Sequence, residues 1–149
     1  MNKRIAVIFA AVLLIYLALN LYIAWNLWVF LDTVFRGVSP LWPGAAAVIG
    51  AFAYFIGRAG RRRFPGPARA FEFIGVYWMA AFEYAVLSLP PANVLAWLLI
   101  QAGLNRTAVI GGIGAFVLAA IALLLIRGTW NAWHPVIRRH RITVAKQPR

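Results

Sequence analysis

Residues 5–31 read IAVIFAAVLLIYLALNLYIAWNLWVFL, and only Asn20 and Asn26 interrupt this apolar run. As a helix rising 1.5 Å per residue, the run would reach ~40 Å, which exceeds the hydrocarbon core of a bilayer, roughly 30 Å thick. It is also longer than the apolar core of a signal peptide, which has about 7–15 residues. We therefore expect a retained transmembrane helix that tilts or protrudes.

The composition of the whole chain agrees with a bilayer environment. Apolar residues make up 64% of the 149 residues, charged residues only 12%, and the mean hydropathy is +0.80; a soluble domain has about one quarter charged residues. Cysteine is absent, which excludes disulfides and thiolate metal sites. The net charge of +12 comes from basic clusters beside apolar runs, so anionic lipids are the expected partner, and no nucleic acid is expected.

Three further apolar segments, residues 43–57, 70–88 and 107–126, predict three more spans. Pro90 and Pro91 lack the N–H that a helix interior needs, so we expect the third span to stop there. Residues 92–104 then predict a short interfacial or re-entrant helix. The predicted fold is an all-α membrane protein with four transmembrane helices plus this short helix. Residues 1–128 form its transmembrane domain, and residues 129–149 form a basic juxtamembrane tail or linker.

The distribution of lysine and arginine predicts the orientation of the four spans. With the N-terminus inside, thirteen basic residues fall on the cytoplasmic side and only Arg36 and Arg106 fall outside. Cytoplasmic loops carry such an excess of basic residues. We therefore expect both termini to face the cytoplasm, in what would be a bacterial inner membrane.

Small residues spaced four apart predict where the helices pack. Gly50 and Gly57 lie on the second span, each four residues after an alanine, and the fourth span carries Gly111, Ala115 and Ala119. Such faces let helix backbones approach closely. They predict packing between helices, and a homo-oligomer is a further possibility that they allow.

Two glutamates on the third span differ in depth. Glu72 lies beside the arginine-rich loop, where an interfacial ion pair is expected. Glu83 lies ~20 Å beyond residue 70, and an acid at that depth needs a partner or a proton. Asn20 lies ~22 Å along the first span, so we predict a structural contact between Glu83 and Asn20. A proton or cation site and a contact with a lipid substrate are the alternatives.

Headgroup contacts are predicted at both basic clusters, from Arg61, Arg62 and Arg63 in the loop and from Arg138, Arg139 and Arg141 in the tail. Trp130 and Trp133 are predicted interfacial anchors. His134 and His140 stand in a segment without acids, so no metal site is predicted. The sequence contains no recognisable catalytic constellation.

Residues 130–144 read WNAWHPVIRRHRITV. This stretch resembles the junction in membrane-anchored calcineurin-like metallophosphoesterases, where the last span runs into an aromatic-Asn-Ala-x-x-Pro sequence and then a basic segment. Trp133 departs from the family, which has arginine there. The resemblance implies a cytoplasmic catalytic domain with a divalent two-metal centre. That family's Asp-x-His, Gly-Asp, Gly-Asn-His and Gly-His-x-His motifs are absent from this chain, so neither a catalytic residue nor a cofactor is carried over to it.

The function that these features predict is that of a membrane anchor. It would hold a catalytic domain, absent from this chain, near lipid or lipid-linked phosphate substrates. An alternative is a small oligomeric channel or proton-coupled carrier that uses Glu83. A third is a helper subunit without chemistry of its own.

Overall fold

A computed structural model describes residues 3–133 of the chain. It consists of four helices, which are α1 (Lys3–Phe35), α2 (Leu41–Gly60), α3 (Pro65–Gln101) and α4 (Arg106–Trp133). All four are long and apolar enough to cross a membrane, and this part of the chain contains no strand. The predicted all-α fold with four helices of membrane-spanning length is thereby confirmed. The tail residues Arg138, Arg139 and Arg141 lie outside the described residues.

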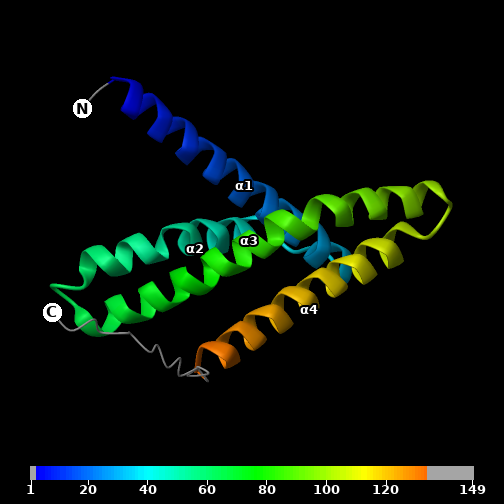
Figure 1. The fold of residues 1–149 in the computed structure, drawn as a ribbon. Coiled ribbons are helices and arrows are strands. Elements are labelled where there is room, and N and C mark those ends of the chain that lie inside the picture. The colour runs from blue at the N-terminus through cyan, green and yellow to red at the C-terminus, as the bar shows by residue number, and fades with distance from the viewer. Residues whose placement is uncertain (1–2, 134–149) are drawn as a thin grey trace, which may run out of the picture.

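The helices form an open arrangement (Figure 1). α2 and α3 lie side by side, α3 and α4 form a long hairpin, and the first half of α1 leans away from the other three. Almost every side chain between Lys3 and Ile15 is therefore exposed. The second half of α1 packs against the other helices and contains its buried residues, Asn20 and Ala24, whereas the most extensive helix contact of the fold is between α2 and α3.

Two glycines set the close approach of α2 to α3. A Cβ on Gly57 would lie 2.6 Å from the carbonyl oxygen of Ala68 and 2.6 Å from the backbone nitrogen of Glu72. A Cβ on Gly75 would overlap the backbone of Tyr54. Because backbone atoms cannot move aside as a side chain can, only glycine fits at either position. This is the small-residue packing that membrane helices use.

The predicted stop at Pro90 and Pro91 is wrong, because α3 runs through both prolines to Gln101. The short separate helix predicted for residues 92–104 is therefore the last part of a 37-residue helix. Each proline removes one backbone N–H, which weakens the helix locally without forcing it to end. Transmembrane helices tolerate such prolines because local adjustments and neighbouring groups satisfy the freed carbonyls. Gly103, at φ +90, lies in the turn to α4.

The turn between α1 and α2 is fixed by side chains that the sequence prediction did not use. The carboxylate of Asp32 accepts hydrogen bonds from the backbone N–H groups of Gly37, at 2.9 Å, and Val38, at 3.2 Å. The indole of Trp28 donates to the carbonyl of Val38 at 2.8 Å. Asp32 is therefore a structural acid, whose role is to hold this turn.

The face of α4 that packs within the chain differs from the predicted one. Gly114 lies against the ring of Phe30, and Val109 and Val117 are buried. By contrast, Ala115 and Ala119 are exposed, and a Cβ on Gly111 would meet nothing within 4 Å. The ring of Phe30 needs the space above Gly114, and this contact turns Gly111, Ala115 and Ala119 away from the other helices.

Candidate functional site

A polar contact joins three helices in the middle of the fold. Asn20 of α1 is 4% exposed and accepts a hydrogen bond from the indole nitrogen of Trp78 of α3 at 3.0 Å. Its amide donates to the carbonyl of Tyr16 at 2.8 Å, and the Tyr16 hydroxyl donates to the carbonyl of Ala51 of α2 at 3.2 Å. The Trp78 ring covers Gly50, where a Cβ would overlap it. The buried amide is thus satisfied within the chain.

The structure does not bring Glu83 to Asn20. Glu83 is exposed, and no described residue hydrogen-bonds or pairs with its carboxyl group. The reason is geometric: Trp78 and Glu83 are five residues apart, so their side chains point ~140° apart around the helix. Turning Trp78 toward Asn20 turns Glu83 outward. Glu83 is the middle residue of α3, so this carboxyl lies far from both helix ends.

A cluster of exposed arginines surrounds the turn between α2 and α3. We call it the five-arginine cluster, and it consists of Arg58, Arg61, Arg62, Arg63 and Arg69.

Only one acid lies beside this cluster among the described residues. Arg61 pairs with Glu72 at 3.3 Å, with side-chain exposures of 57% and 17%. The other oxygen of Glu72, Oε1, is buried without a hydrogen-bond partner. One carboxylate cannot neutralise five guanidinium groups, so this end of the fold presents a strongly positive surface. A surface of this charge attracts anionic groups.

The end of α4 lies on the same side as this cluster (Figure 1). The hydroxyl groups of Tyr77 and Thr129 are 2.7 Å apart and tie α4 to α3. Trp130 and Trp133 follow with exposed side chains. Exposed indoles at the end of a span are typical of the boundary between the hydrocarbon core and the headgroups.

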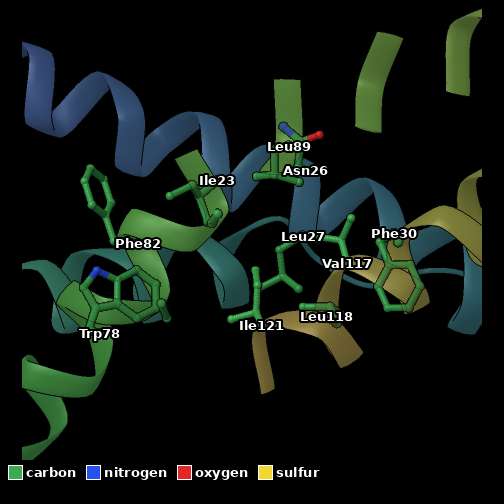
Figure 2. Close-up of a pocket in the computed structure, with 13 residues that line it drawn as sticks. Ile23, Asn26, Leu27, Phe30, Trp78, Phe82, Leu89, Val117, Leu118 and Ile121 are labelled. Carbon is green, nitrogen blue, oxygen red and sulfur yellow. The ribbon is translucent and has the colours of Figure 1, made fainter. Parts of the chain in front are cut away.

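An apolar cavity of about 170 Å³ lies between α1, α3 and α4. Figure 2 shows Ile23, Leu27 and Phe30 of α1 facing α3 and α4 across it. Phe82 and Leu89 line it from α3, and Asn26 lines it from α1 with its amide donating to the carbonyl of Tyr22 at 2.9 Å. Within residues 3–133, no group of three His, Cys, Asp or Glu side chains could hold a metal ion. The described side chains of the cavity can therefore hold an apolar group by complementary shape and van der Waals contact.

Trp78 is the central residue that the sequence prediction missed. An indole N–H inside a span needs an acceptor, and this need was a usable signal for a contact with Asn20. Tyr22 and Asn93, which hydrogen-bond at 2.8 Å across α1 and α3, were also missed, because residues 92–104 were expected to form a separate helix.

Comparisons of the chain with protein-family models, curated proteins and solved structures find no match. The resemblance to metallophosphoesterases therefore depends on residues 130–144, of which the structure describes only residues 130–133.

Proposed function

We propose that the chain is a membrane-embedded anchoring domain whose basic end faces the cytoplasm of a bacterial inner membrane. The observation that supports this proposal is the exposed five-arginine cluster, beside which the described residues place a single acid, Glu72. At the opposite end of the described helices, Arg36 and Arg106 are the only basic residues. An excess of basic residues on one side is the signal that orients membrane helices.

The anchored part would be a metallophosphoesterase domain that follows the tail. Residues 130–144 resemble the junction of that family, and α4 leads directly into this segment. Its divalent two-metal centre would belong to the catalytic domain. Attachment to the membrane raises the effective concentration of a catalytic domain near lipid phosphate substrates without any new contact. The anchor therefore affects the reaction through proximity.

A fusion experiment tests the anchoring role. A soluble phosphoesterase domain is placed after residue 149 and compared with the same domain alone. The substrates are a lipid phosphate in vesicles and a soluble phosphate ester. We expect a gain on the order of 10²-fold or more with the vesicle substrate and unchanged activity with the soluble ester. Equal rates on vesicles with and without the anchor would contradict the proposal.

Glu83 supports a second candidate function, that of a small oligomeric channel or proton-coupled carrier. Its carboxyl group is exposed at the middle of α3 and has no partner among the described residues. Ionisable groups at membrane depth mark ion pathways by default. In a homo-oligomer, a second copy would cover this group. Proton flux in liposomes that disappears in Glu83→Gln would favour this function, whereas an absence of flux in both proteins favours the anchor.

A further inference from the structure

A wider space of about 750 Å³ lies next to the apolar cavity between α1, α3 and α4. The two spaces share five lining residues, which are Asn26, Phe30, Leu89, Gly114 and Val117. The two spaces therefore adjoin each other at these residues, and together we call them the groove. It leads from the turn between α3 and α4 toward Trp78 and Phe82 in the middle of the fold.

The mouth of this groove is cationic. Arg106, the first residue of α4, lines it and is exposed, and no acidic side chain lines either part of the groove. The backbone N–H groups of Thr107 and Ala108 already donate to the side-chain oxygen of Asn105, at 2.9 and 3.2 Å. The guanidinium of Arg106 is thus the group at this mouth that can bind an anion.

A hydroxyl group lies between the cationic mouth and the apolar end. The Tyr22 hydroxyl oxygen accepts a hydrogen bond from the Asn93 amide at 2.8 Å, and no described residue accepts the hydrogen of Tyr22 itself. This O–H can therefore donate to a ligand oxygen. Trp25 and Trp97 also line this part of the groove with exposed indole rings. Rings of this kind gather at the level of lipid headgroups.

We propose that this groove binds one anionic phospholipid. Its phosphate pairs with Arg106, an ester oxygen accepts the O–H of Tyr22, and one acyl chain runs past Phe30 into the apolar cavity. Along the groove, a cation is followed by a hydroxyl donor and then by the apolar cavity. This order matches the order of phosphate, ester and hydrocarbon in such a lipid. The site lies at the opposite end from the five-arginine cluster, so it does not depend on the anchoring function.

Photo-crosslinking tests the proposal with the full chain. The chain is reconstituted into phosphatidylethanolamine vesicles that contain a small fraction of phosphatidylglycerol with a diazirine in one acyl chain. After illumination, the crosslinked peptides are mapped. We expect the crosslinks to concentrate on residues that line the groove, including Leu89 and Val117. A phosphatidylcholine probe with the same diazirine should label these residues several-fold less, because its quaternary ammonium group lies close to the phosphate and offsets the negative charge that Arg106 attracts.

Two variants and a matched control make the result specific. Arg106→Gln should lower groove crosslinking about fivefold or more, because it removes the charged hydrogen bond to phosphate. Tyr22→Phe should lower it about threefold, as expected for one membrane hydrogen bond. Arg36→Gln removes the other basic residue at this end, outside the groove, and should change nothing. Crosslinks spread evenly over exposed helix faces, or equal losses in Arg36→Gln and Arg106→Gln, would overturn the proposal.

Discussion

Trp78 of α3 donates its indole N–H to the side-chain oxygen of Asn20 of α1, at 3.0 Å, in the middle of the fold. This hydrogen bond links the helix that leans away from the others to the tightly packed pair of α2 and α3. It also fixes the rotation of α3 about its axis, since the Trp78 ring must lie over Gly50. That rotation decides which other α3 side chains face the bundle.

The Asn20–Trp78 hydrogen bond should contribute measurably to stability. We expect a double-mutant cycle of Asn20→Leu and Trp78→Phe to give a coupling between about 0.6 kcal/mol, the average for hydrogen bonds between membrane helices, and about 1.7 kcal/mol, the largest such value. Unfolding of the reconstituted protein in a denaturing detergent measures it. Trp42→Phe is the control, because Trp42 is 75% exposed, and it should change little. A coupling near zero would mean that packing alone joins α1 to α3.

The approach of α2 to α3 should depend on Gly75. A Cβ there overlaps the backbone of Tyr54, so Gly75→Ala should lower the free energy of unfolding by about 1–3 kcal/mol, as overpacking does. Gly112→Ala makes the same chemical change where a Cβ meets nothing within 4 Å, and should cost nothing. The same unfolding assay compares the two. Equal changes in the free energy of unfolding for Gly75→Ala and Gly112→Ala would show that α2 and α3 can move apart to make room for the added methyl group.

Replacing Glu83 should not destabilise the isolated chain. Its side chain is exposed and bonds to no described residue, so Glu83→Leu should change the free energy of unfolding by less than about 0.5 kcal/mol. The measurement uses monomeric protein in detergent. A loss well above this value would show that the carboxyl group has a structural partner, as the sequence alone suggested. If the loss of stability is absent in detergent and appears only when the protein is reconstituted at a high protein-to-lipid ratio, the partner of Glu83 is a second copy of the chain.

The basic tail should lie on anionic membrane surfaces. Each basic residue near such a surface contributes about 1 kcal/mol, so Arg138, Arg139 and Arg141 together contribute ~3 kcal/mol before screening by salt. Replacing all three by Gln should leave the spans intact and make a spin label at Thr143 mobile and water-exposed. The experiment uses electron paramagnetic resonance in anionic vesicles. Unchanged mobility would mean that packing, and not lipid charge, orients the tail.

The features that could be predicted from the sequence are those that depend on the apolar or basic composition of a single segment. The length of each apolar run predicts a span whatever its neighbours are, and the arginines around residues 58–69 mark a basic end directly. The continuation of α3 past Pro90 and Pro91 was missed because proline weakens a helix by an amount that the surroundings can offset.

Features that depend on helix rotation were not predictable from one sequence. Glu83 and Trp78 lie on the same span at similar depths in the membrane, so depth alone does not decide which of them faces Asn20. The contact of Trp78 with both Asn20 and Gly50 decides between them, and that contact exists only once α1, α2 and α3 are placed together. The same holds for α4, where the fit of Phe30 over Gly114 selects the packed face.

The proposed function requires the five-arginine cluster to face the cytoplasm, and labelling of single cysteines measures this orientation. The chain has no cysteine of its own, so Arg62→Cys and Arg106→Cys each create one reporter. Intact cells are treated with a membrane-impermeant maleimide. We expect Arg106→Cys to be labelled and Arg62→Cys to be protected until the cells are permeabilised. Labelling of Arg62→Cys in intact cells, with protection of Arg106→Cys, would contradict the proposed orientation.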